Sequence, residues 1–404
     1  NNILKQNKLN QTNLWRFGIS GDRPIVFLEI ESLDDLSLVK ELLHTFEYYK
    51  SKSVFIDLII LNCKNKEEKQ IINKEIDEEK YRMYALNSFH KTPGNIYVID
   101  PNDINTDEYV LFKTVARLYI DSHKFHSLEE FVNNLQKLNT TSRKEKWVKE
   151  LSLPITYDEN KLTYYNGFGG FASNGKKYVI TNSNTPFIWC NVLANPHFGS
   201  IISNNQTGFS YSQNSHEYKL TAWTNDNLLS DISEGIKIND VQLDYAYAQI
   251  GFGNITWKGR FKNLDVELKQ FVAVDDPIKF YKIKIKNNGA RKQRICLKYW
   301  LNPCLGETEE KTGRYIQSDF NKNENYVSLI NKYSINFSSL TTFISCTLPI
   351  TDFNTKRLLY KEIETSIYID AKEEYELAFM LGTSDSDILS ILKKYNTINK
   401  IKAE

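Results

Sequence analysis

Polar and aromatic side chains of chemically useful types are concentrated between residues 189 and 226. They are Trp189, Asn191, Asn195, His197, Asn214, His216, Glu217, Trp223, Asn225 and Asp226. Flat aromatic rings stack on the apolar faces of sugar rings, while amides and carboxylates form paired hydrogen bonds to neighbouring hydroxyl groups. These residues are therefore candidates for a sugar-binding surface.

The same residue types have a purely structural interpretation. Asn and Asp side chains close Asx-turns between strands, and aromatic rings fill the core of a β-protein. Composition alone does not decide between the two interpretations. A second cluster, at residues 166–171 (Asn-Gly-Phe-Gly-Gly-Phe), predicts a tight turn because Gly permits a positive φ and a close approach of the backbone.

The elements that must position these residues are short strands. From Tyr164 onward, turn residues separate short alternating runs, with no helical segments between them. The expected strands are 177–180, 218–221, 242–248, 259–261, 264–274, 278–285, 294–301, 326–330, 341–346, 364–369 and 375–381. This pattern predicts a large antiparallel β-sandwich of a dozen or more strands. A final amphipathic helix is expected over 385–401, without a packing partner of its own, as a connector.

The N-terminal third has a different pattern. Strands are expected at 25–30, 54–61 and 95–99, and helices at 33–51, 66–86, 105–119 and 127–138. Alternating strands and helices predict a small α/β domain with a parallel sheet. The region lacks the fingerprint of a nucleotide-binding site. The Gly-containing segment 18–21 comes before the first strand, and the residues directly after that strand are acidic and would repel a phosphate.

These patterns give the fold class as α+β multidomain. The expected divisions are a connector at 1–23, the α/β domain at 24–140, a linker at 141–160, the sandwich at 161–383 and a linker helix at 384–404. Because the first residue is Asn rather than Met, we expect the chain to be processed, trimmed or cut from something longer.

Composition narrows the class of protein. The apolar fraction of 41%, the charged fraction of 25% and the formal net charge of +1 are those of an ordinary globular protein and give no basis for a nucleic-acid or membrane partner. No apolar run approaches a membrane span, and no signal peptide is visible. The five cysteines form no CxxC pair, so we expect buried free thiols, a cytoplasmic location, and neither a metal site nor a cofactor.

Longer motifs add a resemblance. They are Asn-Gly-Phe-Gly-Gly-Phe (166–171), Trp-Cys-Asn-Val-Leu-Ala-Asn-Pro-His-Phe-Gly (189–199), Gln-Asn-Ser-His-Glu (213–217), Leu-Thr-Ala-Trp-Thr-Asn-Asp (220–226) and the segment 13–26. They resemble the N-terminal β-sandwich region of glycoside hydrolase family 94, the former glycosyltransferase family 36 of inverting sugar phosphorylases. The spelling is most similar to the β-1,2-glucan branch, which holds 1,2-β-oligoglucan phosphorylases and the phosphorylase-like part of cyclic β-1,2-glucan synthases.

The resemblance implies a galactose mutarotase-like supersandwich and a division of labour. Family members carry the general-acid Asp and the phosphate-binding groups on an (α/α)6 barrel that follows the sandwich. We therefore expect no catalytic residue in this chain, Asp226 included, and we leave open whether the chain counts as an enzyme. In the whole protein, inorganic phosphate would be the co-substrate, because it replaces the activated water of an inverting hydrolase. The implied partners are a β-1,2-linked glucan and that barrel, with a homo-oligomer as a further possibility.

Three functions remain open from the sequence. The first is the non-catalytic part of a β-1,2-oligoglucan phosphorylase, in which the sandwich shapes the glucan cleft. The second is part of a cyclic β-1,2-glucan synthase. The third, from another class, is a free-standing carbohydrate-binding or scaffold protein.

Overall fold

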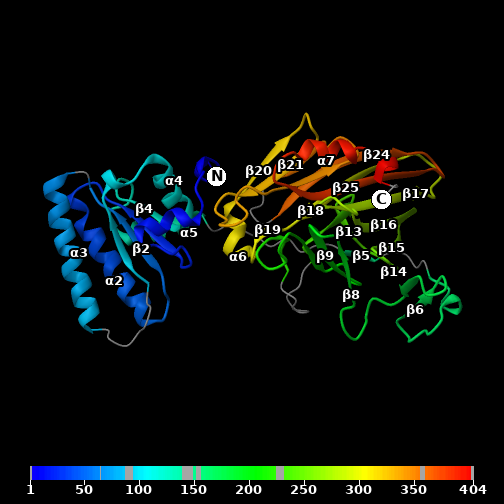
Figure 1. Cartoon of the computed structure of the whole chain (residues 1–404), viewed down its shortest axis with the longest axis horizontal. Helices are drawn as coiled ribbons and strands as arrows, with labels where there is room; N and C mark the ends of the chain where they lie inside the picture. The colour runs from blue at the N-terminus through cyan, green and yellow to red at the C-terminus, as the bar shows by residue number, and fades with distance from the viewer. Residues whose placement is uncertain are drawn as a thin grey trace. The chain divides into compact units, whose positions relative to one another are not determined.

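The computed structural model describes residues 2–63, 65–86, 94–138, 149–151, 156–223, 232–354 and 360–401. The chain divides into two compact units (Figure 1). Unit 1 comprises residues 1–145 together with 332–336, and unit 2 comprises residues 146–331 and 337–404.

Unit 1 is built on a parallel sheet, sheet A. Its strands in the described residues are β1 (Ile25–Glu29), β2 (Asp57–Leu61), β3 (Ile96–Ile99) and β4 (Ala116–Asp121). Their order across the sheet is β3–β2–β1–β4. The first three strands are the predicted ones, and the α/β class of this region is confirmed.

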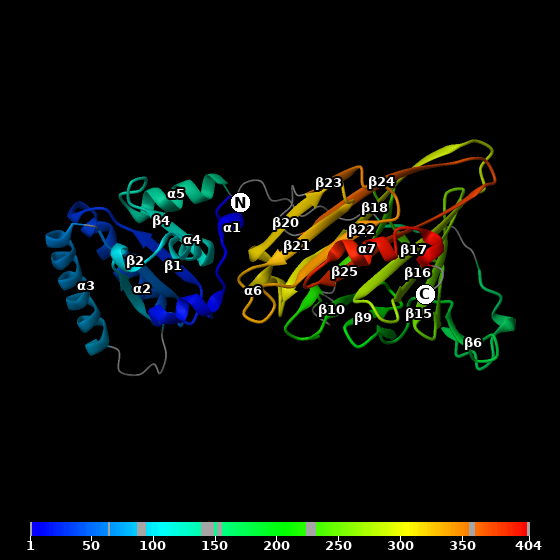
Figure 2. The same ribbon diagram turned by 45° about the horizontal axis from the view of Figure 1, so that its top comes forward.

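Helices cover both faces of sheet A (Figures 1 and 2). They are α1 (Asn2–Gln6), η1 (Gln11–Phe17), η2 (Leu33–Asp35), α2 (Leu36–Ser51), α3 (Lys66–Leu86), η3 (Pro101–Asp103), α4 (Thr106–Val115) and α5 (Leu128–Leu138). Helices α2, α3 and α5 share one hydrophobic cluster with the face of the sheet that carries Leu28 and Ile60. On the other face, Phe112 of α4 packs 5.8 Å from Phe27, measured between ring centroids.

The helix expected over 105–119 is wrong in its last turn. Helix α4 ends at Val115, and the chain continues directly as β4, which pairs in parallel with β1. The apolar positions from 111 to 120 fit a helical period at the start and a strand period at the end, so local pattern does not fix the boundary. The free edge of β1 decides it, because it offers a ladder of backbone hydrogen bonds to the segment.

The described residues of unit 2 form three further sheets. In the described residues, sheet B comprises β5 (Lys149–Leu151), β12 (Glu234–Ile238), β13 (Val241–Asp244), β18 (Gln293–Leu301), β23 (Asp352–Asn354) and β24 (Lys361–Ile369). Sheet C comprises β6 (Gly169–Ala172), β7 (Lys177–Ile180), β14 (Tyr247–Gly251), β15 (Asn254–Phe261), β16 (Leu264–Val272), β17 (Ile278–Asn287), β20 (Ile316–Asn321), β21 (Tyr326–Asn331), β22 (Thr341–Cys346) and β25 (Glu374–Ser384). Sheet D comprises β8 (Cys190–Ala194), β9 (Phe198–Ser203), β10 (Gly208–Ser212), β11 (Lys219–Thr221) and β19 (Pro303–Gly306).

The sheets of unit 2 enclose one hydrophobic core. Strand β16 alternates buried and half-buried residues, as expected when one face packs inward. Large rings fill the interior, among them Trp257 and Tyr218, which are at most 1% exposed. The pairs are antiparallel except β5–β13, which is parallel. The short helical elements of this unit are η5 (Glu159–Lys161), α6 (Glu309–Thr312), η6 (Gly313–Tyr315), α7 (Ile388–Lys394) and α8 (Ile398–Ile401). The predicted fold class is therefore confirmed.

The single strand expected over 242–248 is wrong. Strand β13 ends at Asp244 in sheet B, and β14 begins at Tyr247 in sheet C. The chain crosses from one sheet to the other at Tyr245, whose ring lies in the core 6.4 Å from Trp257. Alternation of apolar residues continues through the crossing, so the pattern does not reveal the change of sheet.

The expected C-terminal helix is two short helices, α7 and α8, and it does have a packing partner. Leu392, Tyr395 and Ile401 are buried against a cluster on sheet C that includes Phe280 and Met380. Figure 2 shows α7 lying across the strands of this sheet. The Asp276 carboxylate, in the β16–β17 turn, accepts hydrogen bonds of 2.5 Å from Lys394 Nζ and Tyr395 OH.

Two smaller expectations are also resolved. Cys63, Cys304 and Cys346 are buried free thiols, but Cys190 is exposed on β8 and Cys296 is half-buried, so the expectation of buried thiols is wrong for Cys190 and only partly met at Cys296. Among the described residues, no helix is both long and apolar enough to cross a membrane.

One buried ion pair joins the three sheets of unit 2. Lys279 of β17 is 1% exposed, and its Nζ lies 2.7 Å from Glu234 Oε1 of β12. The same ammonium group donates to the hydroxyl groups of Ser200 and Ser210, at 2.9 and 3.3 Å, in β9 and β10. Burial lowers the pKa of Lys279, and the Glu234 carboxylate opposes that shift.

We expect Lys279→Met to lower the free energy of unfolding of unit 2 by about 3–5 kcal/mol, because it leaves the Glu234 carboxylate buried without its counter-charge. Urea denaturation followed by circular dichroism measures this. The control is Lys284→Met, which breaks the exposed Lys284–Glu374 pair and should cost less than about 1 kcal/mol. Equal, small effects of the two substitutions would contradict the role of Lys279.

We also expect α7 to loosen in acid. Burial by itself raises the pKa of Asp276, but the hydrogen bonds from Lys394 and Tyr395 outweigh it and hold the pKa below its ordinary value. The stabilisation is therefore present above about pH 4 and is lost as the pH falls through the folded-state pKa. Asp276→Asn should speed amide hydrogen exchange in residues 388–401 at neutral pH. Asp275→Asn, at the exposed neighbour, should not, and a similar effect of both variants would refute the assignment.

Candidate functional site

Most of the described candidates lie at the two ends of sheet D. The β-ladder places Ala194 opposite Gly199, Ser212 opposite Phe198 and Tyr211 opposite Lys219. The loops β8–β9 and β10–β11 therefore emerge at the same end. We call this the histidine end, and its candidate residues are Asn195, His197, Asn214, His216 and Glu217.

Asn195 fixes the shape of the β8–β9 loop. Its Oδ1 accepts from the backbone N–H groups of His197 and Phe198, both at 2.8 Å, which closes an Asx-turn. Its Nδ2 donates to the carbonyl groups of Ala273 and Asp276, at 2.9 and 2.7 Å. The amide thus ties the loop to the β16–β17 turn that holds α7, and it leaves the His197 side chain exposed.

Asn214 has the same role in the β10–β11 loop. Its Oδ1 accepts from the backbone N–H groups of His216 and Glu217, both at 2.9 Å. The two loops are joined by a hydrogen bond of 3.0 Å from Gln213 N to the His197 carbonyl. The structure therefore brings His197, His216 and Glu217 together on two connected turns.

The charged side chains near His216 include residues that directly follow β19, an edge strand of sheet D. Glu307, directly after β19, has its Oε1 3.9 Å from His216 Nε2, while Lys311 Nζ donates to its Oε2 at 2.6 Å. The hydrogen bond from Lys311 holds the pKa of Glu307 below its ordinary value. Lys219 Nζ donates to the Glu307 carbonyl at 2.9 Å.

Sequence reasoning missed Glu307, Lys219 and Lys311 at this end. The available signal was the charged run Glu307-Thr-Glu-Glu-Lys311 directly after a strand. Its place beside His216 follows from the pairing of β11 with β19, which joins residues far apart in the chain. Together these groups supply imidazole, carboxylate and ammonium groups at an open surface, which suits the binding of a hydroxyl-rich molecule.

The two candidate tryptophans lie at the opposite end of sheet D. Trp189 precedes β8 and is half-buried, with its ring edge-to-face on Phe168 and Tyr178 at 6.2 and 5.9 Å. Trp223 follows β11 and stacks on Phe209 at 5.0 Å. Strands of five residues separate the two ends by about 15 Å.

The described candidates therefore form two patches, and their role in sugar binding stays a prediction. Asn191 lies between the patches, on β8, with its Nδ2 donating to the Asn254 carbonyl at 3.2 Å. Asn225 and Asp226 lie outside the described residues.

The glycine cluster supports the tryptophan end. Asn166 Oδ1 accepts from the backbone N–H groups of Phe168 and Gly169, at 3.1 and 3.0 Å. A Cβ atom on Gly169 would lie 2.4 Å from the Val179 carbonyl oxygen, so the close approach of β6 to β7 requires glycine there. The predicted tight turn is confirmed, and it brings Phe168 against Trp189.

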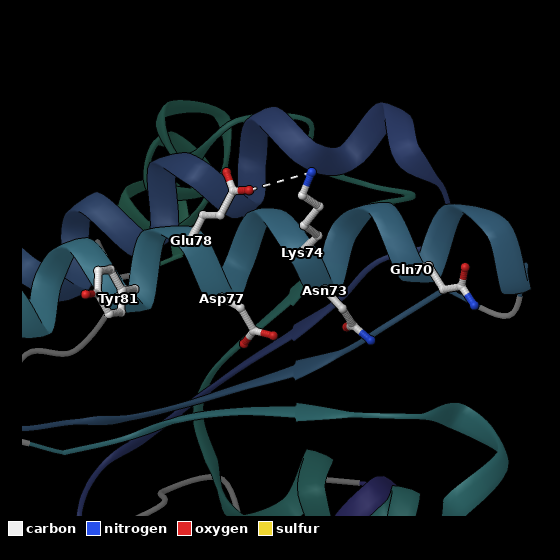
Figure 3. A pocket seen from close by; sticks show the side chains of 6 residues that line it. All are labelled: Gln70, Asn73, Lys74, Asp77, Glu78 and Tyr81. Atoms are coloured by element: carbon white, nitrogen blue, oxygen red, sulfur yellow. Dashed lines mark ion pairs between the residues drawn. The ribbon is translucent and has the colours of Figure 1, made fainter.

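A large hollow lies elsewhere, on the outer face of α3. It has a volume of about 760 Å³, and all its lining residues come from that helix: Gln70, Asn73, Lys74, Asp77, Glu78 and Tyr81. Figure 3 shows Asn73 and Asp77 projecting from one side of the helix, while Lys74 pairs with Glu78 on the other. Asn73 Oδ1 also accepts from Asn62 Nδ2, at 2.7 Å. A surface formed by one helix lacks the enclosing walls of a ligand pocket.

No set of three or more His, Cys, Asp or Glu side chains in the described part of the chain is grouped closely enough to hold a metal ion.

Comparison with known proteins bears on this sandwich. The model of the family "Glycosyl hydrolase 94, supersandwich domain" matches residues 176–360. The cyclic beta-(1,2)-glucan synthase NdvB of Rhizobium meliloti is 23% identical over 384 residues, which cover 88% of this chain and 14% of that protein. The chain thus spans about a seventh of the length of this curated relative.

Two solved structures are also similar. A putative kojibiose phosphorylase from the human microbiome matches with a TM-score of 0.33 and 10% identity, over 56% of this chain and 35% of that one. A putative aldose 1-epimerase from Escherichia coli K12 matches with a TM-score of 0.33 and 7% identity, over 49% of this chain and 99% of that one.

The family match covers the strands from β7 to β23, among them all five strands of sheet D, whose ends carry most of the described candidate residues. NdvB lies on the β-1,2-glucan branch that the sequence motifs indicated. Residues 176–360 of this chain thus match the supersandwich domain of glycosyl hydrolase family 94, the family that the sequence motifs resemble.

Proposed function

We propose that this chain is the non-catalytic part of a protein that acts on β-1,2-linked glucans, and that the histidine end of sheet D contacts the glucan. The observation that carries the proposal is the pair of connected turns at that end. Asn195 and Asn214 hold these turns by their own hydrogen bonds, and the turns expose the side chains of His197 and His216.

The chemistry of these groups supports a glucan. Imidazoles both donate and accept hydrogen bonds, and Glu307 supplies a carboxylate beside His216. Neighbouring hydroxyl groups on a pyranose ring also both donate and accept hydrogen bonds, so they can pair with these groups. The glucan linkage is taken from the resemblance and from the name of the relative NdvB.

The preferred reaction of the whole protein is phosphorolysis of β-1,2-glucooligosaccharides to glucose 1-phosphate, with inorganic phosphate as co-substrate. The general acid and the phosphate-binding groups would lie on the (α/α)6 barrel of the family. The second candidate, a cyclic β-1,2-glucan synthase, is favoured by the similarity to NdvB over 88% of this chain. The two candidates share the glucan and differ in the activity of the rest of the protein.

Calorimetric titration with β-1,2-glucooligosaccharides tests the contact. We expect His197→Ala/His216→Ala to weaken binding about tenfold, because each lost hydrogen bond at an exposed site contributes about 0.5–1.5 kcal/mol. The matched control is His123→Ala, at an exposed histidine in unit 1, which should bind like the unaltered chain. Unchanged affinity of the double variant would refute the proposed contact.

Incubation of the chain with the same oligosaccharides and phosphate should release no glucose 1-phosphate, since the proposal places the general acid outside these 404 residues. An enzymatic assay for glucose 1-phosphate measures this. A family 94 phosphorylase added to the same mixture shows that the substrate is competent. Turnover by the chain alone would overthrow the non-catalytic assignment.

A further inference from the structure

The sequence motif at residues 13–26 forms a compact turn in unit 1. Helix η1 begins after Asn10, whose side chain caps it, and ends at Phe17, followed by the C-cap Gly18 with a φ of 74°. The segment buries Leu14 and Ile19 completely but leaves the Trp15 side chain 55% exposed. The proposed glucan contact on sheet D makes no use of this tryptophan.

Trp15 borders a pocket of about 400 Å³, a size within the usual range for small-molecule sites. Ile335 adds a second apolar wall, and Gln11, Ser20 and Asp22 add polar groups. A single exposed tryptophan on a surface needs no explanation, but one that faces a pocket with a polar rim does.

Hydrogen bonds within the chain hold the polar rim in place. Gln11 Nε2 donates to the Ser20 carbonyl at 2.9 Å and to Asp22 Oδ1 at 3.2 Å, and Asp22 N donates to Ser20 Oγ at 3.2 Å. Within the described residues, nothing else hydrogen-bonds to the Asp22 carboxylate, and the Trp15 indole N–H has no acceptor. Both groups therefore remain available to a ligand.

Ile335 reaches the pocket from residues 332–336, a segment that belongs to unit 1 although it is distant in sequence. Gln11 N donates to the Tyr333 carbonyl at 3.1 Å, and Tyr333 OH donates to the Gly21 carbonyl at 3.5 Å. A Cβ atom on Gly21 would lie 2.5 Å from that hydroxyl oxygen. The pocket is thus built from two segments whose close fit depends on a glycine.

These groups suit a pyranose ring. An indole face packs on the apolar C–H face of such a ring, and a carboxylate with a neighbouring hydroxyl group binds adjacent sugar hydroxyls. The Asp22 carboxylate disfavours a phosphate or another anion. A wholly apolar partner would bury Asp22 and Ser20 without new hydrogen bonds, at a cost in free energy.

We propose that the pocket at Trp15 is a second sugar-binding site, which holds a pyranose unit of a glucan chain. The identity of the sugar as a β-1,2-linked glucose rests on the proposed function. Trp15 supplies the stacking surface, and Asp22 accepts hydrogen bonds from the hydroxyl groups of the bound ring.

Calorimetric titration of the whole chain with β-1,2-glucooligosaccharides tests this site, with β-1,4-linked oligosaccharides of equal length as the linkage control. We expect two independent sites on the unaltered chain. Trp15→Ala should weaken one of them at least tenfold, and Asp22→Ala should weaken the same one. Trp15→Phe, which keeps an aromatic face, should retain most of the affinity.

The matched control is Tyr81→Ala, which removes another exposed aromatic ring, on α3, and should leave both sites unchanged. Circular dichroism spectra and urea midpoints of each variant show whether it folds like the unaltered chain. Asp22→Ala keeps the test valid if Trp15→Ala proves unstable.

The outcomes separate this inference from the proposed function. If Trp15→Ala and Asp22→Ala bind like the unaltered chain while His197→Ala/His216→Ala loses affinity, the second site is refuted and the proposed contact on sheet D stands. If only the Trp15 and Asp22 variants lose affinity, the second site stands and the contact on sheet D is refuted. No glucan binding by the unaltered chain overturns both.

Discussion

The sandwich depends on one buried charge pair, between Lys279 and Glu234. Lys279 is on sheet C, Glu234 is on sheet B, and the serine hydroxyls that share the ammonium group are on sheet D. Because the pair is almost wholly removed from water, its Coulombic attraction is strong, and the cost of misplacing either group is also high. The strands that carry Ser200 and Ser210 also carry the two loops of the histidine end, so the position of those loops relative to the core is set by this pair.

The sequence was sufficient to predict the bounds of an element where its local pattern agrees with its packing. Strand β22 and helix α3 have the predicted bounds. It was insufficient where a non-local partner decides. Strand β4 forms because the edge of β1 is free to pair with it. The strand expected over 242–248 is interrupted at Tyr245 because its first part pairs in sheet B and its last part in sheet C. The terminal helix is held by a hydrogen bond from Lys394 to Asp276, a residue far from it in the chain.

The candidate residues show the same division. Sequence reasoning identified loops that the structure places at the ends of sheet D, but residue type does not separate a side chain that shapes a loop from one that the loop presents. Asn195 and Asn214 use their amide oxygens on the backbone of their own turns, whereas His197 and His216 are exposed. The ladder of sheet D, invisible in the sequence, separates Trp189 and Trp223 from these histidines.

Residues 332–336 give the molecule an unusual connectivity. They follow β21 and precede β22 of the sandwich, yet they complete unit 1 through Tyr333. The polypeptide therefore enters unit 1, leaves it, and re-enters it for five residues before finishing unit 2. A gene fragment ending at residue 145 would encode an incomplete α/β unit, with Gln11 N and the Gly21 carbonyl deprived of their partners. Neither unit is one continuous stretch of sequence. Recombination that exchanged everything after residue 145 would therefore also exchange the five residues 332–336 of unit 1.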